Sequence, residues 1–397
     1  MQIASETDRE PSLPLVPPYS RKNPFVAELT RHDRLTKPGS RNDTRHFVLN
    51  LAGSGLRYQP GDSLGVFGQN PPPLVEEVIR LAGFDPETAV AGPGGVPVTL
   101  RQTLLRDYTL NRANRKIISG LAERLPQGEK RNALMEITNN PDLVCAYIET
   151  RDYVDVLAEF PEARFESPQN FLAQLSPVAP RLYSIASSPL PYPDQTHLCI
   201  AVVRYETHGR PKKGLASGFF ADHTDVFVKS IPVYVQESKS FRLPQDTSAD
   251  IIMVGPGTGI APFRAFLQHR MAQGGSGRNW LFFGEQHRAF DFLYEEELLE
   301  YQRAGRLQEL DLAFSRDQEQ KVYVQHRMLE QARELWSWLQ GGAYLYVCGD
   351  ARRMAKDVHQ TLIQIARDQG GMSAEKAEDY IGNSLMKTEK RYLRDIY

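Results

Sequence analysis

The run RLYSIASSP at residues 181–189 combines an arginine, an aromatic residue and several hydroxyl side chains. A guanidinium binds pyrophosphate through paired hydrogen bonds, and an aromatic ring stacks on a flat heterocycle. A flavin dinucleotide has both a pyrophosphate and a flat heterocyclic ring, so it matches these two kinds of interaction. The run therefore predicts a flavin site in which Arg181 contacts the pyrophosphate, Tyr183 lies on the isoalloxazine ring and Ser184 is near the edge that accepts a hydride.

A glycine-rich run, GPGTGIAP at residues 255–262, follows a strand-like apolar segment and precedes a helical one. Glycines let backbone amides approach a phosphate, and the start of a helix adds partial positive charge. Gly257, Thr258 and Gly259 are therefore candidate contacts of a dinucleotide. The spacing differs from GxGxxG, and on this motif alone a tight strand-to-helix turn without a ligand is an equal alternative.

Charged and hydroxyl side chains follow the third strand expected in the C-terminal region. Ser315, Arg316 and Lys321 offer a hydroxyl, a fork-shaped guanidinium and an ammonium, which together suit a phosphate dianion. Two such charged hydrogen bonds, at about 1.5 to 3 kcal/mol each, are worth at least about a hundredfold in affinity. This predicts a preference for NADPH over NADH, and the alternative is an ordinary solvated surface.

The composition argues against several other classes of protein. The chain has 397 residues, with 47 Lys and Arg against 49 Asp and Glu, so no basic field favours nucleic acid or an anionic membrane. The first twenty residues contain no apolar run, so we expect no secretory signal, no membrane insertion and a cytoplasmic location. The three cysteines are far apart, which predicts neither a metal site nor a disulfide framework.

The hydrophobic patterning divides the chain into regions. Residues 1–20 are rich in proline and are expected to form a flexible arm. Residues 21–244 alternate apolar and polar side chains, typical of an antiparallel barrel, but about 73–177 have the spacing of a helical insert. Residues 245–397 alternate four strands with helices, including one helix over 322–339, and predict an open parallel α/β sheet.

Seven motifs occur in order along the chain: RLYSIASSP, VVRYE, GPGTGIAPFRAFLQ, NWLFFG, SRDQEQKVYVQ, YVCGDARRMAKDV and RYLRDIY. Together they resemble the FAD- and NADPH-binding part of the sulfite reductase flavoprotein subunit and of its diflavin reductase relatives. The resemblance covers residues from Pro18 to Tyr397. It implies an α/β plus all-β fold: a ferredoxin-NADP reductase-type FAD-binding antiparallel barrel with a helical connecting insert, followed by an open parallel α/β NADP-binding domain.

The resemblance also implies which residues bind the two cofactors, FAD and NADPH. For FAD, the matching positions are Thr109 in the insert, Arg181, Leu182, Tyr183, Ser184, Cys199, Ile200, Ala201, Tyr205, Gly214, Leu215, Ala216 and Ser217. For the 2'-phosphate of NADPH, they are Ser315, Arg316, Lys321, Tyr323 and Gln325. Val322 and Val324 are further NADPH-binding positions, and Asp357 is expected nearby, on the final helix of the domain.

Four residues resemble the group that surrounds the hydride path in this family: Ser184, Cys348, Asp395 and Tyr397. The resemblance implies that Tyr397 stacks on the flavin where nicotinamide must lie, and displacing such a stack costs about 0.5 to 1.5 kcal/mol. From position alone, Cys348 would be a small core residue and Tyr397 part of a frayed terminus.

Diflavin reductases of this family also contain an FMN-binding flavodoxin domain, which residues 1–20 are too short to form. We therefore expect an enzyme that oxidises NADPH and passes electrons from FAD to a separate protein, either flavodoxin-like or a heme or siroheme subunit. One alternative is a free-standing diaphorase that reduces ferredoxin, flavodoxin or quinone-like acceptors. The other is a redox sensor that binds FAD and NADPH without turnover, against which the intact hydride-path residues argue.

Overall fold

The computed structural model describes residues 19–92 and 95–397. Most of the flexible arm expected at residues 1–20 therefore lies outside the described residues. The ring of Tyr19 packs edge-on against Phe25 at the start of the first strand, with 5.0 Å between centroids. Ser20 forms an isolated bridge with Asn23.

Six antiparallel strands form the first sheet, in the order β8-β3-β12-β1-β2-β9. A bridge between Ile185 and Leu198 brings the two edge strands together, as the predicted barrel requires. Buried apolar side chains that alternate along the strands, such as Phe47 and Leu49, fill its interior. The strands are β1 (Phe25–Arg34), β2 (Thr44–Asn50), β3 (Ser63–Val66), β8 (Arg181–Ser184), β9 (Gln195–Ala201) and β12 (Lys229–Gln236).

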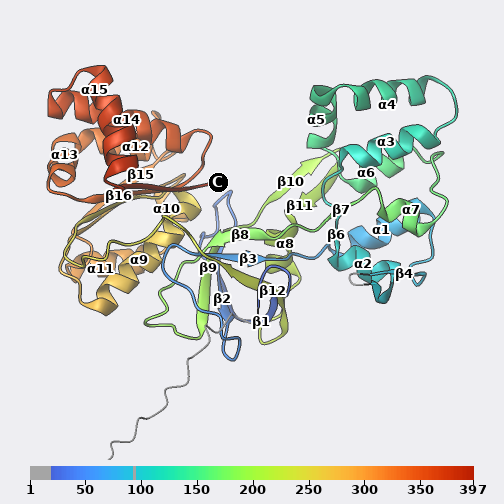
Figure 1. Cartoon of the computed structure of the whole chain (residues 1–397), viewed down its shortest axis with the longest axis horizontal. Coiled ribbons are helices and arrows are strands. Elements are labelled where there is room, and N and C mark those ends of the chain that lie inside the picture. The colour runs from blue at the N-terminus through green and yellow to red at the C-terminus, as the bar shows by residue number, and fades with distance from the viewer. Residues whose placement is uncertain (1–18, 93–94) are drawn as a thin grey trace, which may run out of the picture.

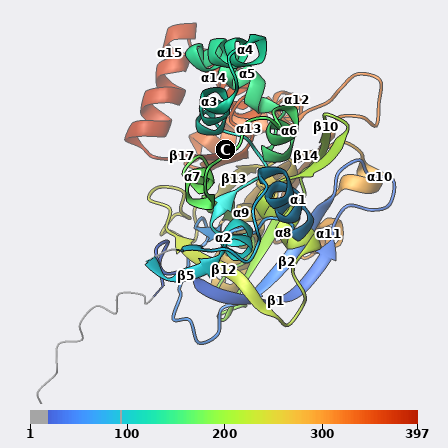
Figure 2. The same cartoon turned by 90° about the vertical axis from the view of Figure 1, so that its right-hand side faces the viewer.

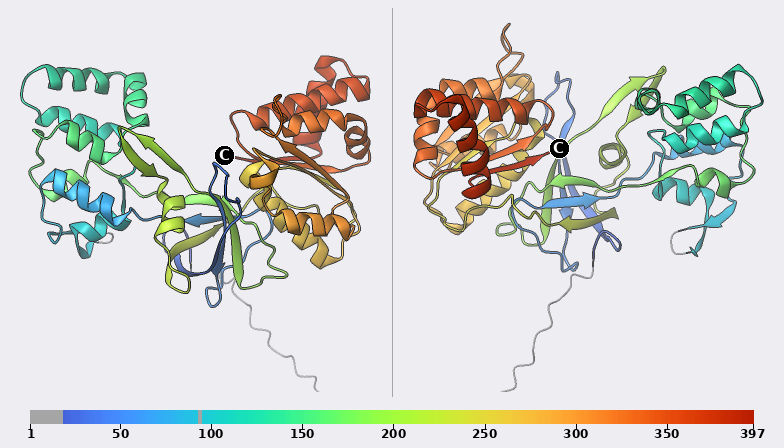
Figure 3. Two further views of the ribbon diagram at one scale, coloured as in Figure 1. Left: turned by 180° about the vertical axis from the view of Figure 1, so that it is seen from behind. Right: turned by 45° about the horizontal axis from the view of Figure 1, so that its top comes forward.

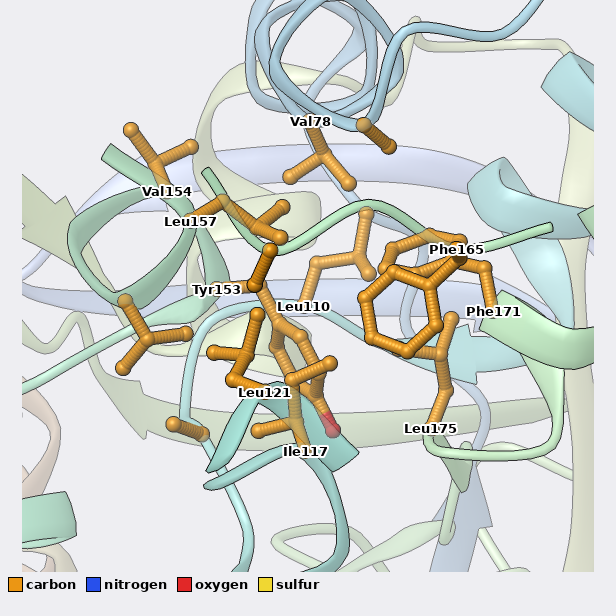
Figure 4. Close-up of a cluster of buried hydrophobic side chains, with 14 of the residues drawn as sticks. Val78, Leu110, Ile117, Leu121, Tyr153, Val154, Leu157, Phe165, Phe171 and Leu175 are labelled. Atoms are coloured by element: carbon orange, nitrogen blue, oxygen red, sulfur yellow. The ribbon is translucent and has the colours of Figure 1, made fainter. Parts of the chain in front are cut away.

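In the described part of the insert between β3 and β8, which lacks residues 93–94, seven helices share one core through their apolar faces. Figure 4 shows Tyr153, Leu121 and Phe171 directed into it, and all three are fully buried. The helices are α1 (Pro72–Ala82), α2 (Leu100–Arg106), α3 (Arg115–Arg124), α4 (Glu129–Asn139), α5 (Pro141–Glu149), α6 (Tyr153–Glu159) and α7 (Pro168–Leu172).

The insert also contains two short strand pairs that the sequence pattern did not predict. Strand β4 (Ala89–Ala91) pairs with β5 (Pro97–Thr99), and β6 (Tyr108–Thr109) pairs with β7 (Ser176–Pro177). Strands of two or three residues are too short to display an alternating pattern, so only the tertiary structure reveals them. The second pair joins a segment within the insert to its C-terminal end, and Thr109 of this pair lines a cavity together with residues of β8 and β9.

The second sheet has five parallel strands in the order β15-β14-β13-β16-β17, with helices on both faces. The first four in the chain are those predicted, and β17 is an additional strand at one edge. The strands are β13 (Ile251–Val254), β14 (Asn279–Glu285), β15 (Glu309–Phe314), β16 (Tyr344–Gly349) and β17 (Tyr392–Ile396), and the helices before residue 320 are α9 (Ile260–Gln273), α10 (Arg288–Asp291) and α11 (Glu295–Arg303).

Two helix predictions in this domain need correction. The single helix expected over 322–339 is divided at Gln331 into α12 (Val324–Glu330) and α13 (Ala332–Gln340). Asp357 is on α14 (Met354–Gly370), which is not the final helix, because α15 (Ala374–Asp379) and a π-helix over 380–388 follow it. The continuation packs on the sheet through Ile381 and Leu385 and leads the chain back to form β17.

The barrel lies between the helical insert and the parallel sheet (Figure 1). Figure 2 views the molecule from the side of the insert, with α1 to α7 toward the viewer. Both views in Figure 3 place the C-terminus between the two flanking parts, close to the barrel. None of the helices within residues 19–92 and 95–397 is both long enough and apolar enough to cross a membrane.

Arg264 on α9 links the parallel-sheet domain to the barrel. Its guanidinium donates hydrogen bonds to the backbone oxygen of Ala186 at 2.7 Å and to Glu297 at 2.8 Å. It also lies over the ring of Tyr294, 4.9 Å from the centroid. The Tyr294 hydroxyl in turn shares a 2.9 Å hydrogen bond with His46 Nδ1 of β2. Because removing one member would leave buried polar groups unpaired, this network specifies how the two domains meet.

Two histidines at this interface are held in the neutral form. Burial lowers the pKa of His46 to about 2 and that of His197 to about 3, and the positive charge of Arg264 adds to both shifts. An unfolded histidine has a pKa of about 6.5. Below that pH, the unfolded chain binds protons that the folded chain does not, so stability is complete above about pH 6.5 and is lost as the pH falls toward the folded-state values.

We expect His46→Gln to reduce the acid sensitivity of the protein, because glutamine keeps a hydrogen-bonding group but does not titrate. Between about pH 6.5 and about pH 5, each histidine that stays neutral in the folded chain lowers the free energy of unfolding by about 2 kcal/mol. Urea unfolding at the two pH values should therefore show a smaller loss for His46→Gln than for the wild type. His208→Asn, in an exposed turn, is the control and should follow the wild type. An equal loss of unfolding free energy in all three proteins would contradict the conclusion that the folded chain keeps His46 neutral.

Candidate functional site

The larger cavity lies between the barrel and the insert and has a volume of about 710 Å³, a size typical of cofactor sites. Strands β8 and β9, the first turn of α8 (Leu215–Asp222) and the C-terminal residue surround it. Most of the predicted FAD contacts line it: Thr109, Arg181, Leu182, Tyr183, Ser184, Cys199, Ile200, Ala201, Gly214, Leu215, Ala216 and Ser217.

Tyr205 is the predicted FAD contact that does not line this cavity. It is on β10 (Arg204–Thr207), which forms an exposed hairpin with β11 (Arg210–Lys213), and its side chain is 40% exposed. The sequence interpretation missed Asn111, Arg112, Ala179, Pro180, Val203 and Ala261. Most of these are within three positions of a predicted contact, so closeness to a motif was the only signal that could have identified them.

The start of α8 is built to approach a phosphate group. Gly214 precedes the helix, and no side chain caps its first N–H groups. A Cβ at Gly214 would lie 2.7 Å from Ser217 Oγ and 3.0 Å from Val203 Cβ, so any side chain there would force these neighbours to shift. The exposed Arg181 lines the same cavity. An uncapped helix start and a guanidinium in one cavity suit a pyrophosphate, so these residues fit FAD.

Ser184 and Asp395 meet at the edge of this cavity. Ser184 Oγ donates a 2.7 Å hydrogen bond to Asp395 Oδ2, and Cys348 Sγ is 4.0 Å from the same oxygen. Burial raises the pKa of the Asp395 carboxyl. Burial and the charge of Asp395 raise that of the Cys348 thiol. The thiol therefore stays protonated, and the group can hold or release a proton beside the cavity.

The C-terminal residue lies at the mouth of the same cavity. The backbone N–H of Tyr397 donates to the oxygen of Gly349, and its own oxygen accepts from Ala351, both at 3.1 Å. Its hydroxyl shares a 2.8 Å hydrogen bond with Thr258 Oγ1. These contacts anchor the residue, while 55% of it remains exposed. The terminal residue is therefore held in place by both its backbone and its hydroxyl group rather than frayed.

A second cavity of about 490 Å³ lies at the carboxyl ends of the parallel strands, where ligands of such sheets bind. The predicted nucleotide contacts that line it are Gly257, Ser315, Arg316, Lys321, Tyr323, Val324, Gln325 and Asp357. Val322 does not line it and instead packs against the apolar core of the sheet. The sequence interpretation missed Pro256, Gly284, Glu285, Gln286, Ala313, Asp350, Arg353 and Met354.

The glycine turn separates the two cavities. Gly257 has a left-handed backbone, with φ of +57°, and lines the second cavity, whereas Thr258 lines the first. Gly259 lines neither cavity and is closely packed instead: a Cβ there would lie 2.2 Å from the oxygen of Cys348. The turn is therefore the boundary that the two cavities share, with Arg316 and Lys321 on one side and Tyr397 on the other.

The second cavity carries charges of both signs. Arg316, Lys321 and Arg353 are positive, and Glu285, Asp350 and Asp357 are negative. Gln325 Nε2 donates to Asp357 Oδ2 at 3.3 Å, which links α12 to α14 across the cavity. The cations suit phosphates and the carboxylates suit ribose hydroxyls or amino groups, so the cavity fits a phosphorylated nucleotide.

Two adjoining cavities, one beside an antiparallel barrel and one at the end of a parallel sheet, define a two-cofactor oxidoreductase. Residues 17–219, slightly more than half of the chain, match the family described as FAD binding domain. Residues 253–360 match the oxidoreductase NAD-binding domain. The chain belongs to this FAD-binding family, and its cofactors are FAD and NADPH.

The chain is similar to curated proteins named sulfite reductase [NADPH] flavoprotein alpha-component. That of Bacillus subtilis is 45% identical over 96% of this chain and 62% of the relative. That of Vibrio cholerae is 44% identical over 96% of this chain and 60% of the relative, and that of Photorhabdus laumondii is 41% identical over 100% and 64%. The chain thus spans somewhat less than two thirds of the length of these relatives.

We expect Arg316→Ala to weaken NADPH binding by removing a charged contact to the 2'-phosphate. Such a bond is worth about 1.5 to 3 kcal/mol, so KM for NADPH should rise about tenfold to 150-fold with little change in kcat. KM for NADH, which has no 2'-phosphate, should barely change. Steady-state kinetics with both nucleotides measure this, with Arg303→Ala on α11 as the control. An unchanged KM for NADPH would exclude Arg316 from the nucleotide site.

Proposed function

We propose that the chain takes a hydride from NADPH onto FAD and passes the electrons to a separate acceptor protein in the cytoplasm. In this proposal residues 21–244 form the FAD-binding part and residues 245–397 the NADP-binding part. The supporting observation is the 2.7 Å hydrogen bond from Ser184 to Asp395 at the edge of the larger cavity, beside Tyr397. A protein that only bound the two cofactors would not need a proton-holding group at that point.

Each part of the proposed reaction has its own residues. Bound FAD would supply a carrier that accepts two electrons together and can release them one at a time. Arg181 and the first turn of α8 would bind its pyrophosphate, and Ser184 with Asp395 would hold a proton beside its ring. Arg316 and Lys321 would bind the 2'-phosphate of NADPH and so orient the nicotinamide past the glycine turn.

The acceptor that we propose is a flavodoxin-like protein or a heme or siroheme subunit. The relatives are named alpha-components of sulfite reductase, which supports an acceptor that is part of an assembly.

The test is anaerobic stopped-flow mixing of the FAD-loaded protein with NADPH, followed by addition of a flavodoxin-like protein or a siroheme subunit. We expect the flavin colour to bleach and then to return when the acceptor is added. Ser184→Ala should slow bleaching by about a hundredfold while leaving NADP⁺ affinity within about twofold, because the hydroxyl acts in the transition state. NADPH binding without bleaching of the flavin would instead indicate a redox sensor. Reoxidation of the flavin by small quinones as fast as by the acceptor protein would indicate a free-standing diaphorase.

Deletion of Tyr397 should increase the affinity for nicotinamide nucleotides. If the ring covers the flavin face, its removal makes the open subsite the default state. A stack worth about 0.5 to 1.5 kcal/mol predicts a gain of about twofold to more than tenfold, with poorer discrimination against NADH and slower release of NADP⁺. Binding titrations and stopped-flow reduction of the chain ending at Ile396 measure this effect.

Tyr397→Phe provides the matched comparison for the deletion. Phenylalanine keeps the ring and loses only the hydrogen bond to Thr258, so most of the affinity gain should be absent from this variant. An affinity for NADPH and NADH that is the same in the deletion and the wild type would mean that the terminal ring does not cover the flavin.

A further inference from the structure

Glu285, the last residue of β14, occupies an unusual position for a carboxylate. It lines the second cavity, which is proposed to bind the phosphates of NADPH. Its Oε2 accepts a 2.8 Å hydrogen bond from the backbone N–H of Gln286 and a 3.3 Å bond from Asn42 Nδ2 of the barrel domain. Its Oε1 is 3.5 Å from where a Cβ on Gly257 would lie. One oxygen is therefore satisfied, and the other faces the glycine turn.

The neighbours of Glu285 carry charges of both signs, and they do not neutralise the negative charge of its carboxylate. Asp291 on α10 is a negative neighbour, itself hydrogen-bonded to Ser40, and Arg316 after β15 is the positive one. From the barrel side, the Cys199 thiol is near enough for the charge of Glu285 to act on it, and it is protonated because burial raises its pKa. Across the cavity are the carboxylates Asp350 and Asp357 and the cations Lys321 and Arg353. Burial, with Asp291, raises the pKa of Glu285 to about 7.

A dinucleotide brings further negative charge to this place. Its pyrophosphate binds where glycines allow backbone amides to approach, which is the turn that Oε1 faces. An ionised carboxylate there repels the phosphates, whereas a protonated carboxyl can donate a hydrogen bond to a phosphate or ribose oxygen. Among the described residues Oε1 has no hydrogen-bond donor, so it is the atom that can carry the proton.

We propose that NADPH binding is coupled to the uptake of one proton by Glu285. The proton comes from solvent, forms an O–H bond on Oε1 when the nucleotide binds and returns to solvent when NADP⁺ leaves. No electron is involved. The proposal rests on the assignment of the second cavity to NADPH, and it makes Glu285 a residue that sets nucleotide affinity without taking part in hydride transfer.

The proposal has a definite pH dependence. Below about pH 7, the carboxyl is already protonated in the free protein, and binding needs no uptake. Above that value, the proton must be acquired on binding, so the affinity for NADP⁺ falls as the pH rises, by up to tenfold per pH unit. Replacing Glu285 with glutamine, which is neutral at every pH, should remove this fall and raise the affinity at about pH 8 by about tenfold.

The experiment is isothermal titration calorimetry of NADP⁺ into the FAD-loaded protein, in two buffers of different ionisation enthalpy. At about pH 7.5, we expect the wild type to take up more than half a proton per chain, and less at about pH 6. Glu285→Gln should lose this uptake. Protons released by the 2'-phosphate contribute equally to both proteins, so the difference between them isolates Glu285. Glu295→Gln, at an exposed contact with Lys37, is the control and should behave as the wild type.

Two results would overturn the proposal. One is a wild type that takes up no proton at about pH 7.5, a measurement that needs no variant. The other is Glu285→Gln with the same uptake as the wild type. If the second cavity does not bind NADPH at all, a different result identifies this, because Arg316→Ala would then leave the affinity for NADP⁺ unchanged.

Discussion

Strand β17 runs parallel to β16 at the edge of the nucleotide-binding sheet and ends one residue before the C-terminus. This pairing places Asp395 beside Cys348 and within hydrogen-bonding distance of Ser184 in another domain. It also holds the backbone of Tyr397 against Gly349. Every part of the proposed hydride path depends on this pairing, because residues from three distant parts of the chain meet only when β17 is in register.

The orientation of the two domains depends on a buried polar network rather than on apolar packing alone. Arg264 reaches the barrel backbone, and Tyr294 reaches His46, so each domain satisfies polar groups of the other. Burying such groups is unfavourable unless all of them are paired, which makes a single arrangement much better than its neighbours. The fixed orientation of the two domains matters because the two cavities share one glycine turn as their common wall.

The nucleotide cavity combines strong cations with carboxylates. Arg316 and Lys321 provide attraction for a phosphate, whereas Glu285 and Asp357 oppose a net anion unless they are protonated or hydrogen-bonded. Such a balance permits affinity without excessively slow release of the oxidised nucleotide, which often limits turnover in enzymes of this kind. The same balance makes the binding step sensitive to pH.

The sequence by itself determined the class of fold and most of the predicted site residues that line the two cavities. Alternating and helical patterns extend over many residues, and motifs such as RLYSIASSP specify local chemistry, so both can be recognised without contacts. Only the tertiary structure decided that YLRDI forms a fifth strand, that Gly259 serves packing and that Glu285 faces the glycine turn. These properties depend on neighbours far away in the chain, and no local pattern of residues encodes which neighbours those are.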